Sequence, residues 1–192
     1  MGFYTKSRTK KNLARPGKKG QDFGLKRNDQ ATSFMTENVQ PELSLEQLRA
    51  LRVPDRDFST PEGAILCLED AYRRQSIESA CICKNFLIEG ILMLLDADPS
   101  LARDEDLRSR NAVQLERTFR KGLAEAWPDI KGVESFFVDR QAYLDGIVLV
   151  TEFWLLPDGS FNKLNVLVAN TVAGWRVLNQ ISDADLENQS SS

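Results

Sequence analysis

The chain is 192 residues long, 42% of its residues are hydrophobic, and its formal net charge at pH 7 is −3. This suits one globular domain of ordinary size, and no apolar run approaches the roughly 18–20 residues that span a bilayer. The chain has no histidine, which excludes His-dependent triads and imidazole metal sites. The charged N-terminus has no apolar segment after it, so no secretory signal peptide is expected. We therefore expect a cytoplasmic protein that binds no membrane and no cofactor.

Charge is distributed unevenly along the chain. Nine of the 25 basic residues but only two of the 28 acidic residues lie in residues 1–30, so this segment carries +7 and the remainder −10. Because the segment is also polar and lacks an apolar period, we expect a disordered basic tail. Such a tail either contacts nucleic acid through its phosphates or is simply solvated. Aromatic residues are not interleaved with these charges as in nucleic-acid-binding segments, so we favour the solvated tail. A nucleic-acid partner is expected only through this tail.

Residues 31–57 are predicted to form a connector with one short helix. Ser44 can cap this helix, and Pro54 ends it because proline disfavours helix in the residue before it. The apolar positions of the helix recur at three-residue spacing and are Leu45, Leu48 and Leu51.

The folded domain is predicted to span residues 58–181, with a polar C-terminal tail over residues 182–192. Its first half shows the apolar periodicity of four helical segments. They begin near Thr60, Ser76, Asn85 and Glu105.

The first of these helices has a clear start in Ser59-Thr60-Pro61-Glu62. Ser59 or Thr60 can accept a free backbone N–H, and Pro61 sits where its missing N–H is not needed. Glu62, three residues after Ser59, fits a capping box. The charged residues farther along this helix are expected to face solvent; they are Glu69, Asp70, Arg73 and Arg74.

The last third of the domain, from Val133 to Ile181, has the sequence of a β-meander. Pro157-Asp158-Gly159-Ser160 predicts a turn in which Gly159 takes a positive φ. Helices followed by a meander predict an α+β fold with the helices on one face of an antiparallel sheet. The predicted strands are Ser135–Val138, Gly146–Leu156, Phe161–Ala169 and Trp175–Asn179.

Both faces of the long strand are largely apolar. Val148, Val150, Glu152 and Trp154 share one face, and the residues between them share the other. One face is therefore expected to lie under the helices and the other to pack against something else. That second layer is either the N-terminal connector or a second subunit, which would give a homodimer through the sheet.

The three cysteines, an odd number, argue against a disulfide framework. A zinc site at Cys81-x-Cys83 would need two more ligands, which only Cys67 or carboxylates could supply. The alternative is that all three are small core thiols on helices. We favour that alternative and expect no metal.

The best candidates for catalysis are Glu152 and Tyr72. Glu152 lies among apolar neighbours on a central strand, where loss of solvation would raise its pKa and suit it to acid–base work. Alternatively, Glu152 pairs with an arginine or lysine or faces water at a curved sheet edge. Tyr72 is then a core aromatic residue whose hydroxyl finds one partner.

A group of acidic residues occupies one predicted loop and the start of the helix after it. Such a group can steer a basic protein partner toward the surface. It can also stabilise the next helix by lying at the positive end of its dipole, and the two roles do not exclude each other. The candidate partner-binding residues are Asp96, Asp98, Asp104, Glu105 and Asp106.

Three segments resemble a nuclear-transport-factor-2-like domain over roughly residues 58–181: Thr60-Pro61-Glu62-Gly63-Ala64, Ala71-Tyr72-Arg73-Arg74 and Gly174-Trp175-Arg176-Val177. Within that superfamily, the chain is most similar to bacterial immunity proteins. The resemblance implies a curved antiparallel sheet that N-terminal helices wrap into a cone with an internal pocket. It also implies a function, the neutralisation of a bacterial toxin by direct binding.

The same resemblance leaves an alternative, a small-molecule-binding protein or a lyase- or isomerase-type enzyme that uses Glu152 and Tyr72 in the cone pocket. Fold alone does not decide between them. The basic tail is not part of the family pattern, and the helical block over residues 85–127 is longer than in the compact enzymes. The histidine-based dyads of such enzymes have no residue to receive them.

Overall fold

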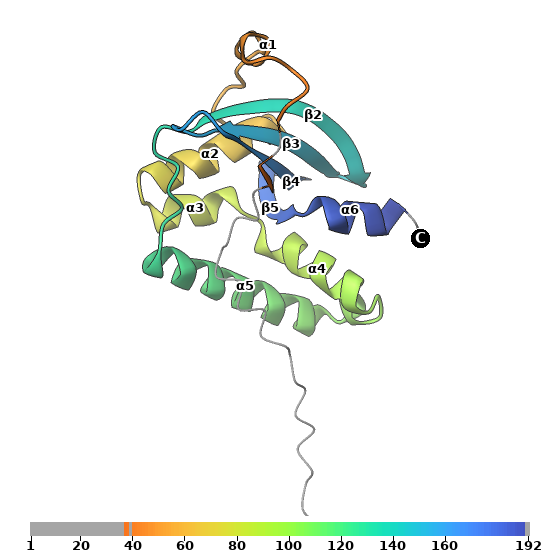
Figure 1. Cartoon of the computed structure of the whole chain (residues 1–192). Helices are drawn as coiled ribbons and strands as arrows, with labels where there is room; N and C mark the ends of the chain where they lie inside the picture. The colour runs from red at the N-terminus through yellow and green to blue at the C-terminus, as the bar shows by residue number, and fades with distance from the viewer. Residues whose placement is uncertain (1–36, 39, 191–192) are drawn as a thin grey trace, which may run out of the picture. The chain divides into compact units, whose positions relative to one another are not determined.

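The computed structural model describes residues 37, 38 and 40–190, so the predicted basic tail of residues 1–30 lies outside the described residues. The described chain has the predicted α+β class, with helices first and an antiparallel sheet after them (Figure 1). In this part of the chain, no helix has both the length and the apolar character needed to cross a membrane. The elements are β1 (Glu37–Asn38), α1 (Leu45–Arg49), α2 (Pro61–Arg73), α3 (Ile77–Cys83), α4 (Phe86–Ala97), the 3₁₀ helix η1 (Leu101–Arg103), α5 (Glu105–Glu125), β2 (Glu134–Leu144), β3 (Ile147–Leu155), β4 (Phe161–Thr171), β5 (Gly174–Ile181) and α6 (Asp183–Ser190).

The helix starts follow local sequence signals. Side chains of Ser44, Thr60, Ser76, Asn85 and Asp104 accept the free backbone N–H groups at the starts of α1 to α5, as capping residues do. One detail of the prediction is wrong. Because Thr60 is the cap of α2, the third helical position is Gly63, and the expected capping box between Ser59 and Glu62 does not form.

The sheet has the order β1-β4-β3-β2, with β5 also paired to β4, and every pair is antiparallel. The turn between β3 and β4 is the predicted one, and Gly159 has a φ of +84°. Strand β2 is much longer than the predicted Ser135–Val138. Its second half is mostly exposed, so the alternation of apolar and polar residues that marks a half-buried strand is missing there.

One face of the sheet packs against the helices. Val150, Val166 and Val168 of the sheet share a buried cluster with Ile65 and Leu68 of α2, and Figure 1 shows α2 lying beneath the sheet. Burial of these side chains is the main force that holds the two layers together.

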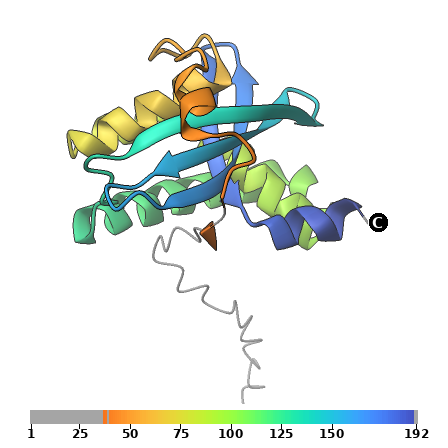
Figure 2. The same ribbon diagram turned by 45° about the horizontal axis from the view of Figure 1, so that its top comes forward.

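The opposite face of the sheet is covered by the connector and by two helices, α4 and α6 (Figure 2). At one end, Leu48 of α1 packs on Phe136, Phe153 and Phe161. The connector therefore packs on this face, as one of the two predicted alternatives required. At the other end, α4 and α6 pack over a second cluster that contains Leu149 and Leu178. The homodimer through the sheet stays a prediction.

A polar contact between these two apolar clusters anchors α6, which occupies the predicted C-terminal tail. Lys163 of β4 donates to both carboxylate oxygens of Asp183, at 2.9 and 2.8 Å. Asn165 donates to the same carboxylate and accepts from Thr151. The pKa of Asp183 is lowered, chiefly by the hydrogen bond from Lys163.

Shortening Leu48 tests whether the connector is part of the folded core. Leu48 is 1% exposed, and Leu→Ala substitutions at buried sites cost about 2–5 kcal/mol. We expect Leu48→Ala to lower the free energy of unfolding, measured by urea titration of the full chain, by an amount in this range. Leu45→Ala is the matched control, because Leu45 lies on the same helix but is 37% exposed. Equal, small effects of both variants would contradict this packing.

Candidate functional site

Two carboxyl groups meet in the interface between α2 and the sheet. Glu69 comes from α2 and is 3% exposed, and Glu152 comes from β3 and is 1% exposed. Buried acidic residues are rare unless they are paired, so this pair is the first place to look for chemistry.

The local structure explains why both side chains point inward. Glu152 shares a face of β3 with Val150 and Trp154, both in the core under the helices. Glu69 follows Ile65 by four residues, which places both on one side of the helix. The expectation that Glu69 faces solvent is therefore wrong, whereas Arg73 does reach the surface with a side chain that is 30% exposed.

Three residues donate to the carboxyl pair. The indole N–H of Trp154 lies 2.7 Å from Oε1 of Glu152 and 3.1 Å from Oε1 of Glu69. Ser135 of β2 donates to the same oxygen of Glu69 at 2.5 Å. Arg73 forms an ion pair with the other oxygen of Glu69 at 2.9 Å. The pair therefore ties α2, β2 and β3 together.

This geometry places a proton on Glu152. Burial raises the pKa of Glu152 well above its ordinary value, and the charge and hydrogen bond of Glu69 raise it further. Two negative charges this close and this buried would repel strongly. Arg73 forms an ion pair with Glu69, whereas the raised pKa of Glu152 favours the neutral acid there. The sequence also allowed Glu152 to pair with an arginine or lysine. In the structure the arginine, Arg73, pairs with Glu69, which lies beside Glu152.

Tyr72 follows Glu69 by three residues on α2. It is 8% exposed and packs edge-on against Trp127, with ring centroids 6.4 Å apart. Burial raises its pKa, and the neighbouring groups that raise it further are Cys83, Glu89 and Cys81. Within the described residues, no hydrogen bond joins Tyr72 to Glu152, so the two catalytic candidates do not form a hydrogen-bonded pair.

Metal and thiol chemistry find little support in the described residues. No group of three or more Cys, Asp or Glu side chains there has the arrangement to hold a metal ion. Cys67, Cys81 and Cys83 are free thiols, and burial raises the pKa of Cys83 to about 12. A thiol that stays protonated at neutral pH is a poor nucleophile.

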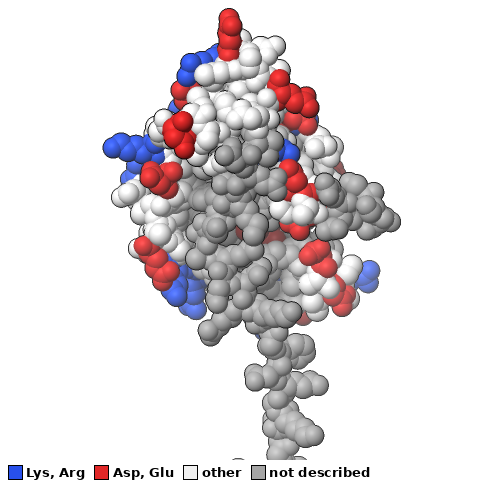
Figure 3. Space-filling model, in the orientation of Figure 1, with Lys and Arg blue, Asp and Glu red and all other residues white. Residues whose placement is uncertain are grey.

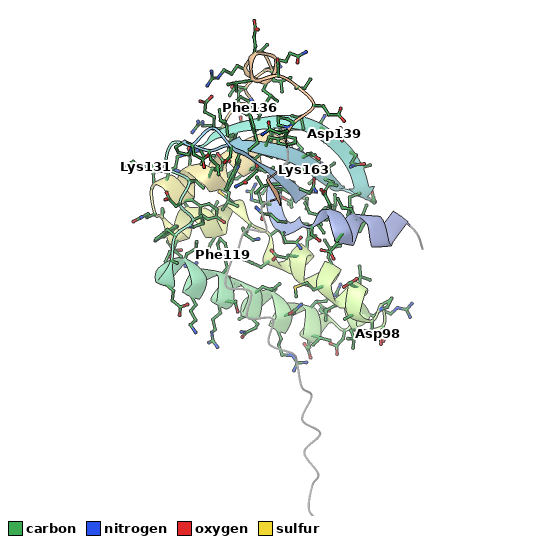
Figure 4. The ribbon with its side chains drawn as sticks, in the orientation of Figure 1. Asp98, Phe119, Lys131, Phe136, Asp139 and Lys163 are labelled. Atoms are coloured by element: carbon green, nitrogen blue, oxygen red, sulfur yellow. The ribbon has the colours of Figure 1, made fainter. Side chains whose placement is uncertain are left out.

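The acidic residues predicted to bind a partner all lie exposed, around η1 and the start of α5. Asp98 is labelled there in Figure 4, and Figure 3 shows acidic side chains at this lower right edge. Two of the five have structural roles: Asp98 accepts from the backbone of Ser100, and Asp104 caps α5. In the described chain, no hydrogen bond or ion pair engages the carboxylates of the other three, Asp96, Glu105 and Asp106.

Helix α4, which leads into this turn, exposes apolar side chains. Leu87 is 48% exposed and Leu95 41%, and Ile91 between them is partly buried. Residues four apart lie on one side of a helix, so the three form a stripe. We call this stripe, together with Asp96, Glu105 and Asp106, the α4 surface. The helix is apolar on nearly every side, yet the side chains of this stripe are not buried.

No family model and no curated protein matches the sequence. Among solved structures, the chain is similar to a Campylobacter jejuni protein described as a candidate NTF2-like transpeptidase, known from a crystal structure at 2.00 Å resolution. The superposition has a TM-score of 0.37 at 14% sequence identity, and it covers 63% of this chain and 99% of that chain. A likeness this distant concerns the arrangement of helices and sheet, and it brings no activity to this chain.

Replacing Glu152 by glutamine tests the buried proton. A pKa raised in the folded state adds stability that is fully present below the unfolded pKa and is lost as pH rises toward the folded value. Glutamine keeps a neutral donor and cannot ionise. We expect the stability of the wild type to fall relative to Glu152→Gln above about pH 5, by about 1.4 kcal/mol per pH unit.

Urea unfolding of both proteins across this pH range measures the difference. Glu42→Gln, at an exposed position, is the control and should follow the wild type. Parallel stability curves for wild type and Glu152→Gln would show that Glu152 is already ionised in the folded protein.

Proposed function

We propose that the protein acts by binding another protein, and that the α4 surface is where the partner docks. The observation that supports this most directly is the exposure of apolar side chains on α4. The helix has the sequence FLIEGILMLLDA, but only Gly90 and Leu94 are buried. A helix that is hydrophobic all round is normally buried on all sides, so a partner is expected to cover the exposed stripe.

Charge indicates the kind of partner. Residues 31–192 carry a net charge of −10. Asp96 follows the apolar stripe, Glu105 and Asp106 begin α5, and no described residue pairs with their carboxylates. A partner that places an apolar segment on the stripe and basic side chains around it would complement both features. Rim charges of this kind act mainly on the rate of association, whereas the buried apolar centre holds the complex together.

The specific form of this proposal is an immunity protein that neutralises a bacterial toxin by direct binding. Its support is the sequence resemblance together with the acidic surface, because a toxin that acts on nucleic acid is commonly basic. The enzyme alternative has weaker support. Glu152 and Glu69 are closed off from solvent, and every carboxylate oxygen of Glu69 already accepts from a protein donor.

The apolar stripe can be tested by capture of the partner. The full chain, immobilised, is exposed to an extract of the source organism, and any captured protein is purified for calorimetry. We expect the double variant Leu87→Ser/Leu95→Ser to weaken binding by at least about tenfold, since it removes two apolar side chains that the bound partner would cover. Val172→Ser is the matched control, because Val172 is fully exposed in the β4–β5 turn. Equal binding by all three proteins would contradict docking on α4.

The acidic rim predicts a kinetic effect. Neutralising Asp96, Glu105 and Asp106 together, as Asn, Gln and Asn, should slow association and reduce its dependence on salt, with a smaller change in dissociation. Surface plasmon resonance with the captured partner measures both rates.

For the immunity form, the captured partner expressed alone should arrest growth, and co-expression of this chain should restore it. Retention of a small molecule, with no protein partner, would favour the enzyme alternative.

A further inference from the structure

A cavity of about 260 Å³ lies between the connector and the first residues of β2, and no residue of α4 lines it. This is at the end of the sheet where Figure 4 labels Phe136. One wall is the end of α1 and the extended chain after it, and the other wall is the edge strand. The residues that line it are Leu48, Arg49, Leu51, Arg52, Val53, Pro54, Glu134, Ser135, Phe136 and Phe137.

The floor of this cavity is apolar and firmly held. Leu48 is 1% exposed and Phe136 is 8% exposed, and both belong to one buried cluster. Phe137 is partly buried and packs against the core on the other side of the sheet. A ligand with an apolar body would therefore meet side chains that are already in place.

The charged groups of the cavity leave one cation without a partner. Arg49 binds Glu134 through two contacts, at 2.9 and 3.3 Å, which neutralises both. Arg52 has no hydrogen bond or ion pair to any other described residue. The lining thus has a net charge of +1 in a body that is strongly acidic.

The edge of β2 adds a backbone wall. Within the described sheet, β2 pairs only with β3, and no backbone hydrogen bond joins the connector to β2 in the described chain. The outer edge of Glu134–Phe137 therefore keeps backbone groups free to bond a ligand, as unpaired strand edges do.

We propose that this cavity binds the carboxylate of a small molecule with an apolar body, with Arg52 as the residue that recognises the carboxylate. A guanidinium presents paired N–H donors that match a carboxylate, and the buried leucine and phenylalanine floor receives the apolar part. The volume lies below the roughly 300–1,000 Å³ of ordinary ligand pockets, so the ligand is small. Its carboxylate belongs to a free acid or to the C-terminus of a peptide.

The test is an NMR titration of the ¹⁵N-labelled full chain with sodium hexanoate and, as a matched neutral probe, hexanamide. We expect hexanoate to give saturable shifts in the amides of residues 49–53 and 134–137 and in the Arg52 side chain. Hexanamide should bind at least about tenfold more weakly, since it lacks the charge-assisted contact. Absence of saturable shifts at these residues up to the solubility limit of hexanoate would overturn the proposal.

Two variants separate recognition by Arg52 from general attraction to cations. Arg52→Gln should weaken hexanoate binding to the level of hexanamide and leave hexanamide unchanged. Arg117→Gln removes an exposed arginine of α5 and should change neither. Equal loss of hexanoate binding in both variants would overturn the role of Arg52. The unshifted amide signals in each spectrum report whether the variant is folded.

A second pair of probes identifies the source of the carboxylate. N-acetyl-leucine carries the end of a peptide chain, and N-acetyl-leucinamide is its neutral match. Tighter binding of N-acetyl-leucine than of hexanoate would support a peptide C-terminus, and the reverse order would support a free acid. Equal binding of N-acetyl-leucine and its amide would count against carboxylate recognition in either form.

Discussion

The contact between Glu69 and Glu152 is the constraint on which the packing of the two layers depends. A charge buried between a helix and a sheet must be neutralised, because the surrounding side chains cannot replace water. Here Arg73 forms an ion pair with Glu69, and the raised pKa of Glu152 favours its neutral form. Trp154 and Ser135 hold both groups at fixed positions. The position of α2 relative to β2 and β3 is therefore set by polar contacts as well as by the apolar cluster around them.

The carboxyl pair lies inside the interface between α2 and the sheet. The carboxyl pair is closed off from solvent, and Tyr72 packs against Trp127. The features that could recognise another molecule lie instead at the periphery. The stripe on α4 is apolar and is followed by exposed acidic residues, and the cavity beside β2 has an apolar floor and an arginine that has no partner among the described residues. The two differ in charge, so they are suited to different ligands.

The second face of the sheet shows how short segments complete a core. Leu48 of α1 covers one end, and α4 and α6 cover the other. Between them, Lys163 and Asp183 form an ion pair that fixes the start of α6. The chain thus buries most of the apolar sheet surface by itself, using elements that are too short to be stable in isolation.

The sequence by itself determined the elements whose signals are local. Thr60 and Pro61 start α2, and Gly159 takes the positive φ that its turn requires. The order of helices and strands was enough to predict the α+β class, and the exposed positions of the acidic residues followed from the loop around them. Each of these depends on a few consecutive residues, so no distant contact is needed to predict them.

Only the tertiary structure decided the features that depend on residues far apart in the chain. Glu69 turned inward because Glu152, Ser135 and Trp154 meet it there, although its helical neighbours are charged. The second half of β2 extends because β3 pairs with it, not because its own sequence alternates. The exposure of α4 and the cavity at Arg52 arise from gaps between elements. Such features depend on which surfaces meet, and a sequence pattern records only which side chains are apolar.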